Sequence, residues 1–341
     1  MTHVPERVLV TGGAGFIGAN FVRHLLATDP SVTIVDLDLL TYAGSLDNLA
    51  ELPDPSRHLF VRGDIQDAEL VQRLFREHRL DTVVHFAAES HVDRSITGPG
   101  AFVRTNVLGT FTLLEAARQA WIVDRELGAR SVRFHHVSTD EVYGSLDRAD
   151  PPFSETTPYA PNSPYSASKA GSDHLVRAYR HTYGLDATLS NCSNNYGPFQ
   201  HDEKFIPTVI RACLSGQPIP VYGDGSNVRD WLYVGDHCAA IDRIVREGQS
   251  GETYNVGGRS ERANIDVART ICRILDRLVP AGAPHEKYLS FVPDRPGHDW
   301  RYAIDSRKIQ ERLRWARKET FESGLERTVR WYVERARRMA A

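Results

Sequence analysis

The sequence predicts an α/β fold in which a doubly wound parallel sheet is joined to a smaller α/β domain. Up to about residue 195, short β-branched runs alternate with longer amphipathic stretches, which implies right-handed βαβ crossovers and helices on both faces of the sheet. A glycine-rich turn follows the first of these runs, at residues 11–18. After residue 196 the alternation loosens and Gly and Pro become frequent, which indicates a second and smaller part.

The expected strands are short and rich in β-branched and aromatic residues. They are Val8–Thr11, Val32–Asp36, Leu59–Gly63, Thr82–Phe86, Arg133–Ser138 and Ala187–Cys192. Helical periodicity predicts the segments that connect them. These are Ile17–Ala27, Ala68–His78, Phe102–Ala120 and Tyr165–Tyr183. Residues 320–339 have the pattern of an amphipathic helix, which we expect to dock on the body of the protein.

The 341 residues suffice for two domains, given about 150 residues for each. We expect residues 1–195 to form the larger domain, with residues 229–256 returning to it. Residues 196–228 and 257–341 then make up the smaller domain.

The composition argues against several kinds of partner. The net charge is −3, from 41 basic and 44 acidic residues, so neither nucleic acid nor an anionic membrane is expected. No window reaches the ~18 apolar residues of a membrane span, and the first residues lack the pattern of a signal peptide. The cysteines fit no metal-binding spacing, so we expect no metal, and reduced thiols in a cytoplasmic protein. They are Cys192, Cys213, Cys238 and Cys272.

The glycine-rich turn is typical of a nucleotide-binding loop. Gly12, Gly15 and Gly18 follow the strand-like Val8–Val10 and precede a helix. Glycines allow a tight turn and a close approach of the backbone to a pyrophosphate, and the helix N-terminus offers unpaired N–H groups to the phosphates. An ordinary strand–turn–helix is the alternative, but acidic residues about 20 positions further on favour a dinucleotide site.

Those acidic residues are Asp36 and Asp38, at the end of the second expected strand. A carboxylate there accepts hydrogen bonds from the adenosine ribose hydroxyls and repels a 2′-phosphate. Because no Arg stands close by in the sequence, NAD is favoured over NADP. The pattern of the strand does not choose between the two aspartates, and the other one is expected to be a solvated loop acid.

A candidate acid–base pair stands at Tyr165 and Lys169. Ser163 and Pro164 predict a helix start, and the i, i+4 spacing then places both side chains on one helix face. A phenol with a pKa of about 10 is a poor base at neutral pH, but a neighbouring ammonium lowers that pKa. Such pairs also occur on the surface of many helices. The glycine loop upstream favours catalysis here.

The glycine loop and the tyrosine–lysine pair together resemble those of the extended short-chain dehydrogenase/reductases, which implies a Rossmann-type fold. The segment Val137–Gly144 narrows the resemblance, because Asp140 and Glu141 stand where sugar-nucleotide epimerases usually have small or hydroxyl residues. An acid pair at the end of a strand can simply cap a helix. It can also divide into an acid and a base when the two environments differ. With Thr139, the run resembles that of the 4,6-dehydratase branch.

Longer blocks resemble the dTDP-glucose 4,6-dehydratases within that branch, and together they span nearly the whole chain. The blocks are residues 38–44, 87–95, 192–198, 227–231 and 294–299. The resemblance also selects Asp38 as the ribose-binding acid. The chain departs from the expected pattern around the nucleotide-sugar side, at His201-Asp202, Phe205, Tyr233 and Gly235.

The resemblance implies conversion of dTDP-glucose to dTDP-4-keto-6-deoxyglucose, in deoxysugar biosynthesis, with tightly bound NAD that is regenerated in each turnover. Tyr165, activated by Lys169, is expected to remove the C4 hydroxyl proton while hydride passes from C4 to NAD. Thr139 is expected to bond the same oxygen. Glu141 then removes the C5 proton, protonated Asp140 gives its proton to the departing C6 hydroxyl, and hydride returns to C6.

The same resemblance implies which residues bind the two ligands. Besides Tyr165 and Lys169, the expected NAD contacts are Gly12, Gly15, Phe16, Ile17, Gly18, Asp38, Leu39, Thr41, Gly44, Asp64, Ile65, Phe86, Ala87, Ala88, Ser90, Thr105 and Asn195. The expected substrate contacts are Ser90, His91, Thr139, Asn194, Lys204, Phe205, Pro220, Tyr222, Arg229, Asn264, Arg295 and His298. The two arginines suit a diphosphate, since a guanidinium pairs two oxygens at once. His91 can instead order the loop after the strand Thr82–Phe86.

Proteins of this kind are usually homodimers joined by a four-helix bundle, for which Phe102–Ala120 and Tyr165–Tyr183 are the candidates. Two other functions stay open at this point. A nucleotide-sugar 4-epimerase uses the same loop, tyrosine and lysine, but does not need Asp140 and Glu141. A non-catalytic dinucleotide-sensing protein keeps the fold but tends to lose the tyrosine or the lysine, and both are present here.

Overall fold

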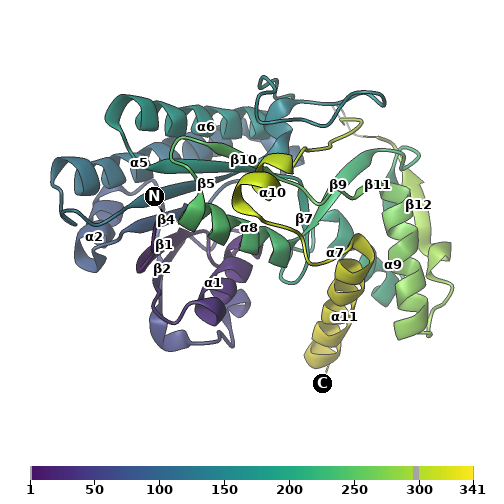
Figure 1. Ribbon diagram of the computed structural model, residues 1–341. Coiled ribbons are helices and arrows are strands. Elements are labelled where there is room, and N and C mark those ends of the chain that lie inside the picture. The colour runs from purple at the N-terminus through teal and green to yellow at the C-terminus, as the bar shows by residue number, and fades with distance from the viewer. Residues whose placement is uncertain (1, 295–298, 341) are drawn as a thin grey trace.

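The computed structural model describes residues 2–294 and 299–340, and its largest element is a parallel sheet (Figure 1). Within these residues, seven strands form the sheet in the order β10-β6-β5-β4-β1-β2-β3, and all neighbouring strands are parallel. They are β1 (Arg7–Thr11), β2 (Thr33–Asp38), β3 (His58–Arg62), β4 (Thr82–His85), β5 (Arg133–Thr139), β6 (Ala187–Cys192) and β10 (Thr253–Val256). The strand order reverses between β1 and β4, where parallel sheets of this kind have a crevice at the carboxyl ends of the strands.

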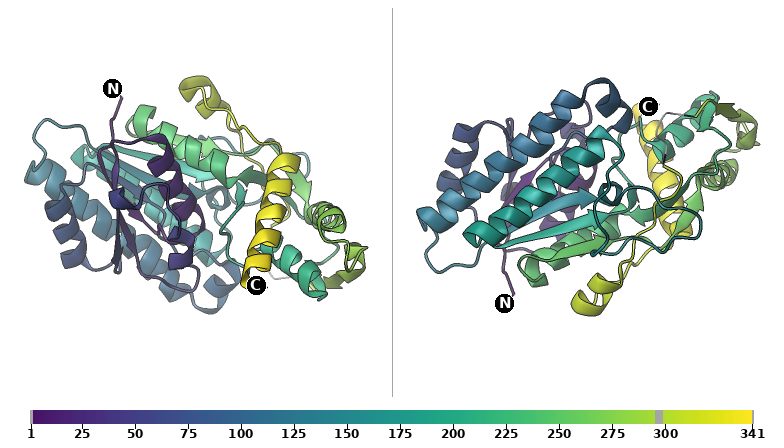
Figure 2. Two further views of the ribbon diagram at one scale, coloured as in Figure 1. Left: turned by 90° about the horizontal axis from the view of Figure 1, so that it is seen from below. Right: turned by 90° about the horizontal axis from the view of Figure 1, so that it is seen from above.

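Helices cover both faces of this sheet (Figures 1 and 2). One face carries α2 (Ala68–His78), α5 (Thr110–Arg118) and α6 (Pro164–Tyr183), and the other carries α1 (Phe16–Thr28) and α8 (Val234–Glu247). Because side chains alternate along a strand, Leu9 of β1 belongs to the apolar core under the first group, while Val8 and Val10 belong to the core under the second. The doubly wound α/β fold predicted from the sequence is confirmed.

A smaller lobe lies beside the sheet and has its own apolar core, which includes Tyr196, Ile210 and Ile271 (Figure 1). In it, β7 (Asn194–Tyr196), β9 (Val228–Tyr233) and β11 (Glu261–Ala263) pair in one small sheet, and β8 (Ile219–Tyr222) pairs with β12 (Leu289–Val292). Its main helices are α7 (Phe205–Ser215), α9 (Asn264–Leu278) and α11 (Phe321–Ala340), while α10 (Arg307–Leu313) contacts β10. The C-terminal helix therefore docks on the body of the protein, as its amphipathic pattern predicts.

The predicted strands and helices of the first half are present, with ends displaced by at most two residues, except for Phe102–Ala120. That segment is helical, but α4 (Pro99–Phe102) and α5 are interrupted and extended by π-helical turns at Val103–Gly109 and Gln119–Val123. The first π-helical turn contains the buried Asn106, whose amide nitrogen donates to the Glu89 carbonyl and to Ser168 Oγ. Periodicity alone cannot distinguish such a widened turn from a regular α-helix.

Two further properties concern the residues in the described ranges. No helix among them is both long and apolar enough to cross a membrane, and no group of three His, Cys, Asp or Glu side chains there is suited to a metal ion. The four cysteines are buried and free. Two of them, Cys213 and Cys272, face each other with their sulfur atoms 3.9 Å apart.

Candidate active site

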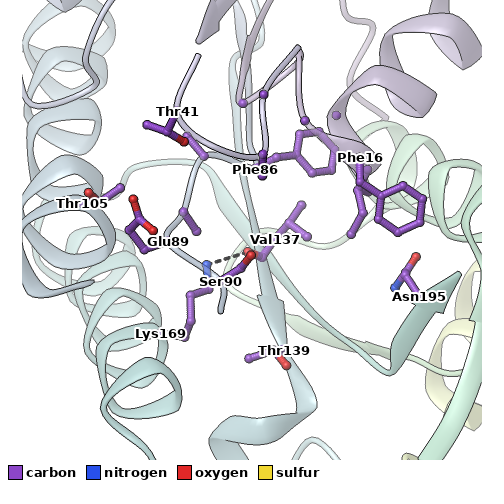
Figure 3. A pocket seen from close by; sticks show the side chains of 18 of the residues that line it. Phe16, Thr41, Phe86, Glu89, Ser90, Thr105, Val137, Thr139, Lys169 and Asn195 are labelled. Atoms are coloured by element: carbon purple, nitrogen blue, oxygen red, sulfur yellow. Dashed lines mark hydrogen bonds between the residues drawn. The ribbon is translucent and has the colours of Figure 1, made fainter. Parts of the chain in front are cut away.

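A cavity of about 350 Å³ opens where the strand order reverses. Its wall combines the turn after β1, the ends of β2, β4 and β5, one side of α6 and the segment that follows β6. Figure 3 shows Lys169 reaching from α6 toward Val137 of β5, with Thr139 at the end of the same strand. Ligands of doubly wound sheets bind in this position, so the cavity is the candidate active site.

Glycines shape the turn between β1 and α1. Gly12 has a φ of +75°, and a Cβ there would lie 2.8 Å from the Ala87 nitrogen. A Cβ on Gly18 would lie 2.2 Å from the Gly12 oxygen, so α1 can pack against the turn only with glycine at this position. Gly15 lines the cavity, and its missing Cβ leaves the backbone exposed to a ligand. This cradle fits a pyrophosphate at the N-terminus of a helix.

Asp38 and Asp36 occupy different environments. Asp38 lines the cavity, and its carboxylate accepts hydrogen bonds from the Ala14 nitrogen at 3.0 Å and the Leu40 nitrogen at 2.7 Å. The expectation that the second acid is a solvated loop residue is wrong, because Asp36 is fully buried. Its carboxylate accepts from the Gly13 nitrogen at 3.0 Å and lies 3.2 Å from His58 Nε2. The reason is that β2 continues to Asp38, which keeps Asp36 inside the sheet.

The parallel register also places Arg62 opposite Asp38, a neighbour that is distant in the sequence. Arg62 is exposed, and it is not among the residues that line the cavity. At this point the cavity is therefore lined by the carboxylate of Asp38 and not by the guanidinium of Arg62. This agrees with the predicted discrimination against a 2′-phosphate.

The end of β5 brings three candidate catalytic residues into the cavity wall. Thr139 Oγ1 accepts a hydrogen bond from the Glu141 nitrogen at 3.3 Å and so caps the short 3₁₀ turn Asp140–Tyr143. Because Thr139 caps this turn, Asp140 and Glu141 are not needed as its cap and are available for another role. Asp140 is 2% exposed, and its Oδ2 has no hydrogen-bond partner among the described residues.

Asp140 is held as a neutral acid by its surroundings. Burial raises the pKa of its carboxyl well above the ordinary value, and the negative charges of Glu141 and Asp230 raise that pKa further. The positive charge of Arg229 acts in the opposite direction but does not outweigh them. The raised pKa favours the protonated form of Asp140, while Glu141 is partly exposed. Two neighbouring carboxyls in unlike environments are what a divided acid–base pair requires.

Tyr165 and Lys169 lie in the first turns of α6. The helix begins with Pro164 after a capping box between Ser163 and Ser166, as the sequence predicts. Tyr165 is 9% and Lys169 4% exposed, which excludes a surface pair. Lys169 Nζ donates to the Val137 carbonyl at 2.9 Å, and Tyr165 shares a hydrogen bond with Thr139.

The expected lowering of the Tyr165 pKa is wrong for this structure. Burial raises the pKa of the phenol well above its ordinary value, and the charge of Glu141 raises it further. Burial also lowers the pKa of Lys169, whose ammonium is engaged by the β5 backbone. The i, i+4 spacing predicts that the two side chains share a helix face. It does not show how deeply that face is buried, and here burial dominates.

The cavity wall contains every residue that we expect to contact NAD, from Gly12 in the first turn to Asn195 after β6. These include Leu39, Thr41 and Gly44 after β2, Asp64 and Ile65 after β3, and Thr105. Their contact with the cofactor stays a prediction.

The expected substrate residues fall into two groups. Ser90, Thr139, Asn194 and Lys204 line the cavity. The others in the described ranges lie outside its wall, namely His91, Phe205, Pro220, Tyr222, Arg229 and Asn264. Arg295 and His298 lie outside the described residues. His91 Nδ1 accepts from the Arg94 nitrogen and caps α3 (Val92–Thr97), which is the loop-ordering role considered above.

Arg229 approaches the catalytic end of the cavity from the smaller lobe. It is 5% exposed, donates to the Asp299 carbonyl at 2.9 Å, and its guanidinium lies over the Tyr302 ring at 4.5 Å. Its charge also acts on Asp140.

Sequence reasoning missed some of the residues in the wall. They are Leu37, Ala43, Gly63, Glu89, Val137, Ser138, Cys192, Ser193, Gln200 and His201. Most stand directly beside a predicted residue, as Ser138 does beside Thr139. The sequence segments that carry the family resemblance could therefore have indicated them. His201 belongs to the segment where the sequence departs from the expected pattern, and Gln200 directly precedes it.

Comparison with known proteins relates this geometry to a family. A family model described as GDP-mannose 4,6 dehydratase matches residues 9–328. The chain is 58% identical over 327 residues to a dTDP-glucose 4,6-dehydratase of Xanthomonas campestris, with 95% of this chain and 92% of the relative covered. The crystal structure of the dTDP-glucose 4,6-dehydratase DesIV of Streptomyces venezuelae, which contains NAD, matches with a TM-score of 0.86. Its sequence identity is 49%, and the match covers 96% of this chain and 97% of that one.

Epimerases of the same fold are more distant in sequence. The UDP-glucose 4-epimerase of Thermus thermophilus has a TM-score of 0.84 but is 32% identical, over 96% of this chain and 99% of that one. The near-complete match to the family model, together with the relatives more than half identical to this sequence, shows that the chain belongs to the GDP-mannose 4,6 dehydratase family, alongside relatives named dTDP-glucose 4,6-dehydratase.

Proposed function

We propose that this enzyme converts dTDP-glucose to dTDP-4-keto-6-deoxyglucose by oxidation at C4, loss of water across C5 and C6, and return of hydride to C6. The single observation that carries the proposal is the buried Asp140, whose pKa is raised, beside Glu141 in the same cavity as Tyr165 and Lys169. Dehydration needs a proton donor and a base next to a redox centre, whereas epimerisation at C4 needs only the redox pair.

The glycine cradle and Asp38 fit NAD. The turn Gly12–Gly18 and the N-terminus of α1 would hold the pyrophosphate, and Asp38 would hold the adenosine ribose. Thr105, Tyr165 and Lys169 would line the nicotinamide end. When bound, NAD supplies a site that takes hydride from C4 of the sugar and gives it back at C6.

Tyr165 and Thr139 act on the C4 oxygen. The phenol of Tyr165 lies within hydrogen-bonding reach of Thr139, so one sugar hydroxyl can contact both. Tyr165 takes the proton of that hydroxyl as C4 becomes a ketone. Because burial raises the pKa of the phenol, the phenolate depends on the positive charge of Lys169 one helical turn away.

Glu141 and Asp140 carry out the elimination. The new C4 ketone acidifies the C5 proton, which Glu141 removes as a base. Asp140, neutral because it is buried, donates its proton to the C6 hydroxyl, which leaves as water. As hydride returns to C6, C5 takes a proton from Glu141, which restores that carboxylate. Asp140 is then reprotonated and Tyr165 gives up the proton that it took from the C4 hydroxyl, so the protons balance over one turnover.

The nucleotide end of the substrate needs cations and amides. We propose Asn194 and Lys204, both in the cavity wall, as its first contacts. We propose that residues of the smaller lobe contact the diphosphate and the base, namely Arg229, Asn264, Pro220 and Tyr222. We also propose His91 and Phe205, which lie outside the cavity wall, as substrate contacts. Arg295 and His298 stay assigned to the substrate by the sequence resemblance alone.

Product analysis tests the proposed function. Purified enzyme mixed with dTDP-glucose is expected to release dTDP-4-keto-6-deoxyglucose, identified by NMR and mass spectrometry. dTDP-galactose as the product would establish the epimerase instead. Absence of turnover with dTDP-glucose, in protein that contains NAD, would support a non-catalytic dinucleotide-binding protein.

Substitution of Asp38 by Ala is expected to remove most of the NAD that copurifies with the enzyme, because the ribose then loses its hydrogen-bond acceptor. The measurement is NAD released from denatured protein per mole of chain. Asp47→Ala is the matched control, since Asp47 is an exposed acid near the same loop and lies outside the cavity wall. Copurification of NADP with the unmodified enzyme would contradict the assignment.

We also propose a homodimer built from a four-helix bundle, in which α6 and the helical segment 99–123 of each subunit pair with those of its partner. Along that segment Val103, Leu108, Phe111 and Val123 are between 43% and 52% exposed, and α5 lies beside α6 (Figure 2). An apolar face of this kind favours association. Phe111→Asp should yield monomers in sedimentation, while Phe291→Asp, at an exposed position of β12, should not. A dimeric Phe111→Asp variant would argue against this interface.

Two further assignments complete the proposal. We propose the division into domains predicted from the sequence, which is supported by β10 pairing with β6 and by α8 packing against α1. The first residues of the range 229–256 differ, because β9 pairs within the small sheet of the smaller lobe. A cytoplasmic location is supported by four cysteines that are buried and free.

A further inference from the structure

A buried carboxylate, Asp173, lies one helical turn beyond Lys169 on α6 and takes no part in the mechanism described above. It is fully buried. Its Oδ2 accepts hydrogen bonds from Ser138 Oγ at 2.9 Å and from the Tyr159 hydroxyl at 2.9 Å, and Asn191 Nδ2 lies 3.5 Å away. Three neutral donors from three separate segments thus converge on one carboxylate oxygen. Because burying a charged group costs free energy even when it is hydrogen-bonded, this arrangement suggests a function for Asp173.

His136 connects Asp173 to Lys169. Its Nε2 lies 3.2 Å from Asp173 Oδ1 and 3.5 Å from Lys169 Nζ. Burial lowers the pKa of this imidazole to about 4, and the charge of Lys169 contributes to the shift, so the ring is neutral at physiological pH. Nε2 therefore lies close to both the Asp173 carboxylate and the Lys169 ammonium, and the neutral ring bridges the two charged groups.

The titratable and charged groups that surround Asp173, His136 and Lys169 lie on several of the elements packed against them. On β4, His85 is buried with its pKa well below the ordinary value, so it is neutral. On β6, burial raises the pKa of the Cys192 thiol, which is therefore neutral as well. Arg177 on α6 donates to the Tyr159 hydroxyl at 2.8 Å, on the side of Asp173 away from Lys169. Asp140 and Glu141 lie on the cavity side, and burial raises the pKa of Asp140, which favours its neutral form.

Asp173 therefore carries the negative charge that faces Lys169 from within the protein. Burial alone would raise the pKa of Asp173, but its contact with His136, the charge of Lys169 and the hydrogen bond from Ser138 outweigh this and lower that pKa. Reciprocally, burial lowers the pKa of Lys169 and the charge of Asp173 counteracts that shift.

We propose that Asp173 is the positioning residue that keeps Lys169 charged and directed at the catalytic tyrosine. The inference rests on the proposed function, because it gives Lys169 the task of stabilising the Tyr165 phenolate. Asp173 also fixes the strand that leads into the catalytic turn, since Ser138 directly precedes Thr139. One buried charge thus sets the state of the redox pair and the position of the residue that shares its substrate oxygen.

The test is the pH profile of turnover in Asp173→Asn, which preserves the shape and removes the charge. Without its counter-charge, Lys169 loses its proton at a lower pH. The alkaline limb of kcat is therefore expected to move down by about 1–3 pH units, the usual effect of one nearby opposite charge. Tyr159→Phe is the matched control, because it removes one hydrogen bond from Asp173 but keeps the carboxylate. Its alkaline limb should stay where it is in the unmodified enzyme.

A merely structural role would give a different result. Asp173→Asn and Tyr159→Phe would then lower kcat by a constant factor at every pH, and an unmoved alkaline limb in Asp173→Asn would overturn the inference. In a Lys169→Arg background the guanidinium does not deprotonate, so adding Asp173→Asn should leave the limb unchanged. If the unmodified enzyme does not turn over dTDP-glucose at all, the proposed function fails instead.

A direct measurement does not depend on whether the Asn variant folds. The chain has five lysines, so labelling lysine with ¹³C allows each side chain to be followed by NMR as the pH changes. Lys169 is identified by the signal that Lys169→Arg loses. In the unmodified protein we expect it to be charged at pH 7.5 despite its burial. A neutral Lys169 at that pH would overturn the inference without any Asp173 variant.

Discussion

Replacing Tyr165 with Phe is expected to slow turnover of dTDP-glucose by about 10²–10⁴-fold, the range contributed by a positioned acid–base group. The substitution removes one oxygen and keeps the ring, which packs edge-on against Phe102 with ring centroids 6.3 Å apart. Folding and NAD content are therefore expected to be unchanged. A loss of rate can then be assigned to the missing hydroxyl, which takes the proton from the C4 oxygen.

The measurement is the steady-state rate of keto-sugar formation, together with the NAD content of each variant. Tyr183→Phe is the matched control, because Tyr183 ends the same helix and is 46% exposed. That variant should retain the full rate. A Tyr165→Phe enzyme within a few fold of the unmodified one would transfer the proton abstraction to another group.

The pH dependence of the same reaction follows from the electrostatics of the site. Burial and the charge of Glu141 raise the pKa of Tyr165, so the neutral phenol predominates at neutral pH and the rate should increase as pH rises. Lys169→Met removes the cation that stabilises the phenolate. The acid limb of the profile is expected to move to still higher pH in that variant, and an unchanged limb would make the pair structural.

The sheet and its helices could be predicted because hydrophobic periodicity and residues that start or end elements are local features of the sequence. β6 and α2 begin and end where the sequence analysis expects, and α6 begins at Pro164 after the Ser163 cap, the helix start that these two residues predict. The π-helical turns at Val103–Gly109 could not be predicted in this way. They accompany hydrogen bonds from Asn106 to residues that are distant in the sequence, and no local pattern encodes such partners.

The same distinction between local and distant determinants applies to the candidate site. The residues that line the cavity follow the ends of strands, so motifs at strand ends predict them well. Charge states were less predictable, because they depend on burial and on distant neighbours. Asp36 proves to be buried against Gly13 and His58, and Tyr165 has a raised pKa instead of a lowered one. Asp173 carries no motif and becomes visible only when its partners on β5 and β6 are in place.

Substitution of Asp140 by Asn is expected to separate dehydration from oxidation. The side chain keeps its shape in a fully buried position but can no longer deliver a proton to the C6 hydroxyl. Elimination should slow by about 10²–10⁴-fold, while Tyr165 and Lys169 still oxidise C4. A 4-keto-glucose intermediate should therefore accumulate on the enzyme and be recoverable after rapid quenching. Asp147→Asn, an exposed acid in the loop that follows, is the control and should dehydrate at the full rate.

Glu141→Gln should act one step earlier than Asp140→Asn, because it removes the base for the C5 proton. Exchange of the C5 hydrogen with deuterated water is therefore expected to fall in Glu141→Gln and to persist in Asp140→Asn, which still contains the base. In the unmodified enzyme, substrate deuterated at C4 should give product with that deuterium at C6, since the hydride is stored and returned. If the label is lost to solvent, or if both carboxamide variants dehydrate at full speed, the acid pair has no part in the elimination. The chemistry would then reduce to what Tyr165 and Lys169 can do alone, which is epimerisation at C4.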